Sequence, residues 1–121
     1  MASQLDESNL PDHSVTRWIV CVTGFSQHEG RPSGLERLQS ELHRQCSCLE
    51  TRVLLKSWKD SPAHLAERIW NWRPKRGAPK VILIGYSYGG FTATLIAREL
   101  AKRGIGVDTM LLVDPVWRPR W

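Results

Sequence analysis

The sequence has few cysteines and no long apolar run, and these two shortages exclude several classes of protein. Only three cysteines occur in 121 residues, and residues 1–13 are unlike a secretory leader, so we expect a reduced, cytoplasmic chain without a disulfide framework. Cys46 and Cys48 lack the spacing of the usual zinc-binding pairs. No apolar stretch approaches the length of a membrane-spanning helix. We therefore expect no transmembrane segment, no bound metal and no cofactor.

Basic residues outnumber acidic ones, but they are not concentrated in one patch. The chain carries 17 Lys and Arg against 12 Asp and Glu, which gives a net charge of +5. Many of the basic residues fall in residues 73–76, 98–103 and 118–120, and the helix dipole alone favours cations near the end of a helix. No phosphate-binding motif of the form Gly-x-x-x-x-Gly-Lys-Ser/Thr is present. These observations disfavour nucleic acids and nucleotides as partners, and they leave open a basic module for other anionic ligands.

Short apolar runs alternate along the chain with segments of helical periodicity. The patterns predict strands at residues 17–23, 51–57, 80–85 and 109–113 and helices at residues 34–45, 62–72 and 88–103. Strands that are apolar throughout are typical of a parallel sheet covered on both faces. The alternation predicts an α/β fold, a three-layer sandwich with helices on both faces of a four-stranded parallel sheet. We expect residues 1–14 to be a disordered lead and residues 15–121 to form a single domain.

The most informative motif lies between the third predicted strand and the third predicted helix. Residues 85–89 read Gly-Tyr-Ser-Tyr-Gly, with Ser87 at the centre. This is the pattern of a nucleophile elbow, a sharp and strained turn that exposes a serine hydroxyl. Small residues are needed two positions before and after the serine because strand and helix crowd the turn, and Gly90 adds another. The alternative interpretation is an ordinary glycine-rich loop that binds phosphate.

With this motif, and with Val-Asp-Pro-Val at residues 113–116, the chain resembles the α/β-hydrolase superfamily, in particular its lipase-like and esterase-like members. The resemblance covers roughly residues 17–115. It implies the spatial strand order 2-1-3-4. It also implies hydrolysis of a small-molecule or lipid ester, or of a thioester, through an acyl-enzyme at Ser87.

The resemblance assigns roles to three further residues. Tyr88 follows the nucleophile, so its backbone N–H matches one donor of the oxyanion hole. Phe25 matches the other donor, because residues 23–25 are similar to the His-Gly-aromatic segment of many lipases, with Thr23 in place of the histidine. Asp114 matches the acid that orients the catalytic histidine. The alternative for Asp114 is a turn initiator before a proline.

The histidine of this pattern is missing, because no histidine follows Asp114, whereas the superfamily places it after the acid. The chain is therefore expected to be a fragment or truncated product, a pseudo-enzyme, or an enzyme with a relocated base. His28 is the only histidine in a loop at the expected catalytic edge, and a solvated surface residue is the competing interpretation. His43 and His64 fall on predicted helices and are expected to be solvated.

The last predicted strand, residues 109–113, would be an open edge if further strands are absent. An apolar open edge invites pairing with another chain, so we expect self-association there. Trp117 and Trp121 follow this strand. We expect them to cover the edge or to contact a partner, and the alternative is that they fill the core. The sequence thus leaves three functions open: a weak or inactive serine hydrolase, a non-catalytic partner-binding remnant of the fold, and a basic module for anionic ligands.

Overall fold

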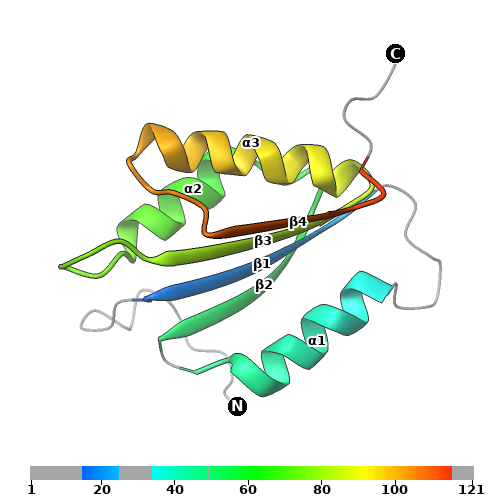
Figure 1. Ribbon diagram of the computed structural model, residues 1–121, viewed down its shortest axis with the longest axis horizontal. Helices are drawn as coiled ribbons and strands as arrows, with labels where there is room; N and C mark the ends of the chain where they lie inside the picture. Colours follow the sequence, from blue (N-terminus) through cyan, green and yellow to red (C-terminus); the bar gives the residue numbers. More distant parts are fainter. Residues whose placement is uncertain (1–14, 25–33, 49, 116–121) are drawn as a thin grey trace.

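The computed structural model describes residues 15–24, 34–48 and 50–115 (Figure 1). In chain order, the elements are β1 (Arg17–Thr23), α1 (Gly34–Cys46), β2 (Thr51–Ser57), α2 (Pro62–Asn71), β3 (Lys80–Tyr86), α3 (Tyr88–Lys102) and β4 (Thr109–Val113). The expected N-terminal lead, Trp117 and Trp121 lie outside the described residues. In the described part of the chain, no helix combines the length and the apolar character that crossing a membrane requires.

The four strands form one parallel sheet in the order β2-β1-β3-β4, which confirms the predicted topology. The register aligns Thr23 with Ser57, Val22 with Gly85, and Tyr86 with Val113. The carboxyl ends of all four strands therefore meet at one edge. In open parallel sheets, ligands bind at this edge.

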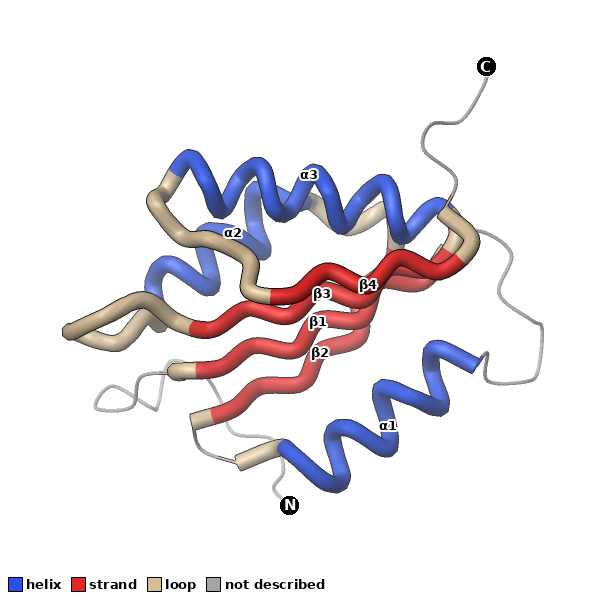
Figure 2. Tube along the Cα trace, viewed as in Figure 1, coloured by secondary structure: helices blue, strands red, loops and turns tan. Residues whose placement is uncertain are grey.

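The helices cover both faces of the sheet, so the predicted three layers are present (Figures 1 and 2). On one face, α2 and α3 pack over a core that includes Trp18, Val20 and Leu83. On the other face, α1 packs chiefly against β1 and β2, over a smaller core that includes Cys21 and Val53. Every residue of β1 after the first is buried, as expected for a central strand covered on both sides.

Candidate active site

Ser87 has a strained backbone at the junction of β3 and α3. Its φ is 58° and its ψ is −124°, and only Ser87 and Asp114 among the described non-glycine residues have a positive φ. These angles are close to those that require glycine at the first central position of a type II′ turn. A serine held there costs on the order of 1–3 kcal/mol, and such strain clusters at functional sites. The backbone of Ser87 is therefore that of the sharp turn expected for a nucleophile elbow.

The glycines on either side of Ser87 are required by close backbone contact. A Cβ atom at Gly85 would lie 2.7 Å from the Cα of Gly90. A Cβ atom at Gly89 would lie 2.1 Å from the carbonyl oxygen of Val22 in the central strand. The elbow therefore packs directly against the backbone of β1, and the spacing of small residues in the motif has a physical cause.

The segment that follows β1 also touches the elbow. A Cβ atom at Gly24 would lie 2.7 Å from the Cβ of Ser87 and 3.1 Å from the backbone nitrogen of Tyr88. Tyr88 is the first residue of α3, where backbone N–H groups point out of the helix end. The structure thus brings together the serine, one predicted oxyanion donor and the start of the loop that carries the other. That second donor, Phe25, lies outside the described residues.

A backbone hydrogen bond joins the end of β4 to the turn around Ser87. The N–H of Ser87 donates a hydrogen bond of 3.0 Å to the carbonyl oxygen of Val113. The next residue, Asp114, is exposed and has a φ of 44°, in a region that aspartate tolerates better than most residues. Asp114 therefore lies at the same sheet edge as Ser87. Its backbone is compatible with a turn as well as with a catalytic acid.

Trp58, which sequence reasoning did not assign to the site, forms part of its surroundings. The Trp58 and Tyr88 rings have centroids 5.4 Å apart. The N–H of Trp58 donates to the carbonyl oxygen of Thr23 at 2.9 Å, and the hydroxyl of Thr92 donates to the carbonyl oxygen of Trp58 at 2.8 Å. These contacts join the end of β2 to β1 and α3. The position of an aromatic residue directly after a strand, at the edge where open parallel sheets bind ligands, was the signal that could have identified it.

The described histidines do not belong to the strand-end segments around Ser87. His43 is in the last turn of α1. His64 is in the first turn of α2, where its backbone N–H donates a hydrogen bond to the Ser61 hydroxyl at 3.2 Å. Both side chains are exposed, which confirms that they are solvated. His28, the candidate base, lies outside the described residues.

The three cysteines do not place a reactive thiol at the turn around Ser87. Cys21 is fully buried in β1, and burial raises the pKa of its thiol to about 11, so the thiol stays protonated near neutral pH. Cys46 and Cys48 are also free thiols and lie at the end of α1 and beyond it. Within residues 15–24, 34–48 and 50–115, no three histidine, cysteine, aspartate or glutamate side chains gather closely enough to hold a metal ion.

Comparisons with protein-family models, with curated proteins and with solved structures give no match for this chain. The arrangement of strands and helices places it as an α/β domain with a four-stranded parallel sheet of order 2-1-3-4.

Proposed function

We propose that this chain is a serine hydrolase-type domain that cleaves an ester or thioester through an acyl-enzyme at Ser87. The observation that carries the proposal is the backbone of Ser87, held at a φ of 58° and a ψ of −124° between two glycines that touch neighbouring backbone. An ordinary helix start has no need of this conformation. A nucleophile at a strand-to-helix turn does need it, since the strained turn exposes the hydroxyl.

The reaction proceeds by acyl transfer. The oxygen of Ser87 attacks the substrate carbonyl carbon, its proton passes to a base, and the carbonyl electron pair becomes an oxyanion. The backbone N–H groups of Tyr88 and Phe25 stabilise that oxyanion, at about 3 kcal/mol for each donor. Collapse of the intermediate expels the alcohol or thiol, which takes up a proton, and water then releases the acid from Ser87. Asp114 orients the base and stabilises its cation.

The chain by itself is expected to turn over slowly, because no described histidine lies in the segments that form the elbow. Hydrolysis of a p-nitrophenyl ester should exceed the rate in water by no more than the roughly 10³–10⁴-fold that remains in enzymes lacking a triad member. His28→Ala should leave this rate unchanged, and His64→Ala is the matched control on a helix. Fast turnover that collapses in His28→Ala alone would contradict this expectation and identify His28 as a relocated base.

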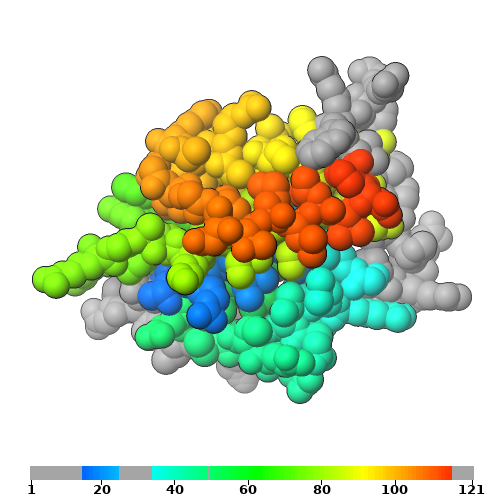
Figure 3. Space-filling model, in the orientation of Figure 1, coloured from blue at the N-terminus to red at the C-terminus, as the bar shows by residue number. Residues whose placement is uncertain are grey.

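A second candidate function, binding of another chain, is favoured by the surface of β4. Leu111 is 51% exposed and Val113 is 39% exposed, and β4 is an edge of the sheet with no charged residue in its sequence. Figure 3 shows its orange and red residues uncovered on the front of the molecule. The opposite edge, β2, carries Arg52 and Lys56, and charges of this kind discourage edge-to-edge pairing. We propose that β4 pairs with β4 of a second copy.

Leu111→Lys is expected to abolish this pairing, because it places a charge on the exposed apolar side of the edge strand. Sedimentation velocity at micromolar concentrations should show dimers for the wild-type chain and monomers for Leu111→Lys. Leu55→Lys is the matched control, since Leu55 is 39% exposed on the other edge strand, and it should leave the dimer intact. A monomeric wild-type chain, or equal loss of dimer in both variants, would argue against the interface.

A further inference from the structure

The amino ends of the strands form a connected edge of the sheet, opposite the elbow (Figure 1). The N–H of Thr16 donates to the carbonyl oxygen of Glu50 at 2.9 Å, and the carbonyl oxygen of Thr16 accepts from the N–H of Lys80 at 2.8 Å. The N–H of Val15 donates to the carbonyl oxygen of Trp72 at 2.9 Å. These bonds bring together the starts of three strands and the end of α2. We call residues 15–17, 50–52, 72–80 and 104–109 the amino edge.

The amino edge is strongly basic. Its four segments hold six basic side chains against two carboxylates, those of Glu50 and Asp108. The Asp108 carboxylate accepts a hydrogen bond of 2.8 Å from the backbone N–H of Val81. The basic residues are separated along the chain, which disfavoured a polyanionic partner, but the fold gathers them at this edge: Arg17, Arg52, Arg73, Lys75, Arg76 and Lys80.

Two of these cations, Arg17 and Lys80, lie side by side. The register of β1 and β3 pairs the two residues, and neighbouring strands are about 4.8 Å apart. Both side chains are exposed, and neither has an ion-pair partner in the described part of the chain. Like charges on neighbouring strands repel each other, and a phosphate bound to both removes this repulsion.

A stacked arginine adds a planar surface to the amino edge. The Arg73 guanidinium lies over the Trp70 ring, 3.5 Å from its centre, and donates to the carbonyl oxygen of Trp70 at 2.7 Å. Trp70 packs against the core, whereas Arg73 is exposed. The guanidinium is therefore held in place from one side, and a nucleic-acid base can stack on its other side. Arg52 lies over Trp72 at the same edge, 5.0 Å from the ring centre.

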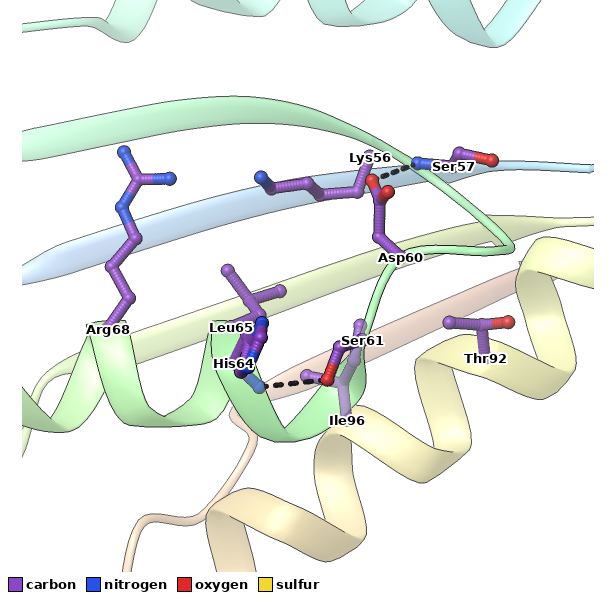
Figure 4. Close-up of a pocket in the computed structure, with 9 residues that line it drawn as sticks. All are labelled: Lys56, Ser57, Asp60, Ser61, His64, Leu65, Arg68, Thr92 and Ile96. Carbon is purple, nitrogen blue, oxygen red and sulfur yellow. Dashed lines mark hydrogen bonds between the residues drawn. The ribbon is translucent and has the colours of Figure 1, made fainter.

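The opposite edge of the sheet has mixed charge. Lys56 and Asp60 line the same pocket of about 210 Å³, between the end of β2, the start of α2 and α3 (Figure 4). A further carboxylate, Asp114, follows β4 at this edge and is exposed. Cations there are accompanied by carboxylates, so the field of the molecule attracts a polyanion to the amino edge and not to the elbow.

We propose that the amino edge binds single-stranded nucleic acid, with phosphates at Arg17 and Lys80 and a base stacked on Arg73. A single strand offers both phosphates and unpaired bases, which fit a surface of cations and exposed guanidinium planes. This binding goes beyond the proposed ester hydrolysis and uses the other edge of the sheet.

An anionic membrane fits the amino edge less well than a nucleic acid does. Binding to a membrane surface requires apolar side chains that enter the lipid. Residues 73–80 read Arg-Pro-Lys-Arg-Gly-Ala-Pro-Lys and contain no large apolar side chain. Trp70 and Trp72 pack against the core instead.

Fluorescence anisotropy of labelled oligo(U) and oligo(dT), each of about 12 nucleotides, measures the binding. The full chain should bind at least one of them, and more tightly than a duplex of the same length; the stronger ligand tells RNA from DNA. Lys80→Gln should raise the Kd about fivefold in about 0.1 M salt and lower the slope of log Kd against log salt by about 0.7, the loss of one phosphate contact. Arg73→Lys should raise the Kd about fivefold without changing the slope, because it keeps the charge and loses the planar stack.

Lys59→Gln is the matched control, because it removes the same charge from a lysine that lies over the Trp58 ring, after β2 and away from the amino edge. It should change the Kd by less than about twofold, since salt screens a charge so far from the ligand. Ser87→Ala should bind like the wild type, so the result does not depend on the proposed hydrolase activity. Lys59, Arg73 and Lys80 are exposed, and a circular dichroism melt confirms that each variant folds.

The proposal is overturned if neither oligonucleotide binds, or if the duplex binds as tightly as the single strands. It is also overturned if Lys80→Gln and Lys59→Gln weaken binding equally, which would show attraction by net charge alone. Binding to phosphatidylserine vesicles without binding to either oligonucleotide would replace it with a membrane surface.

Discussion

Replacing Gly89 by alanine is expected to destabilise the protein by at least about 3 kcal/mol, the upper part of the range for overpacking a core. The added methyl group would lie 2.1 Å from the carbonyl oxygen of Val22, so the backbone of β1 or α3 must move. β1 is the buried central strand, so its backbone cannot shift without displacing the strands and side chains that pack around it. The free energy of unfolding of a domain is about 5–15 kcal/mol, so this loss is a large fraction of the total stability.

Urea unfolding followed by tryptophan fluorescence measures the effect. Gly106→Ala is the matched control, since a Cβ atom at Gly106 meets nothing within 4 Å. That variant should change the free energy of unfolding by no more than about 1 kcal/mol. If Gly89→Ala proved as stable as Gly106→Ala, the close approach of the elbow to β1, and with it the reason for glycine in the motif, would be wrong.

The second large effect is expected at Ser87 itself. Ser87→Ala should lose all reaction with a fluorophosphonate, because the serine oxygen forms the bond to phosphorus while fluoride leaves. Ser87→Gly should lose the reaction as well, yet it should be at least as stable as the wild type, because glycine adopts a φ of 58° without strain. Loss of reaction in a variant that is not destabilised separates the chemistry of the hydroxyl from its effect on folding. The measurement is gel fluorescence of the probe, with urea unfolding of each variant.

The local signals in the sequence were sufficient to predict the order of the elements and the α/β class, whereas the spatial order of the strands was predicted from the family resemblance. The order of strands and helices is confirmed, and the predicted bounds of β3 and α3 differ from those observed by one residue at their carboxyl ends. Ser61 and Pro62 begin α2 as expected for a cap followed by proline at the first position. Apolar runs and capping residues are encoded by neighbours in the chain, so they can be recognised without knowledge of tertiary contacts.

Features that depend on contacts between distant segments were not predictable in the same way. Helical spacing places Leu35, Leu38 and Leu42 on one apolar stripe, but Leu38 is 40% exposed, because α1 packs chiefly over β1 and β2. The contact of Trp58 with Tyr88 also arises only after the end of β2 and the start of α3 are brought together. At the candidate site, Ser87, Tyr88 and Asp114 lie at one sheet edge, as the sequence predicted. The catalytic roles of these three residues stay predictions, as do those of Phe25 and His28.

The most direct test of the account is identification of the residue that carries a fluorophosphonate adduct, by mass spectrometry of the digested wild-type chain. We expect a single adduct on Ser87, formed slowly because neither of the described histidines, His43 and His64, belongs to the strand ends around Ser87. Ser57→Ala, which removes another serine at the same sheet edge, should be labelled like the wild type, and Ser87→Ala should not be labelled. Equal labelling of Ser87→Ala and the wild-type chain, or no labelling of either, would contradict the assignment of Ser87 as an activated nucleophile.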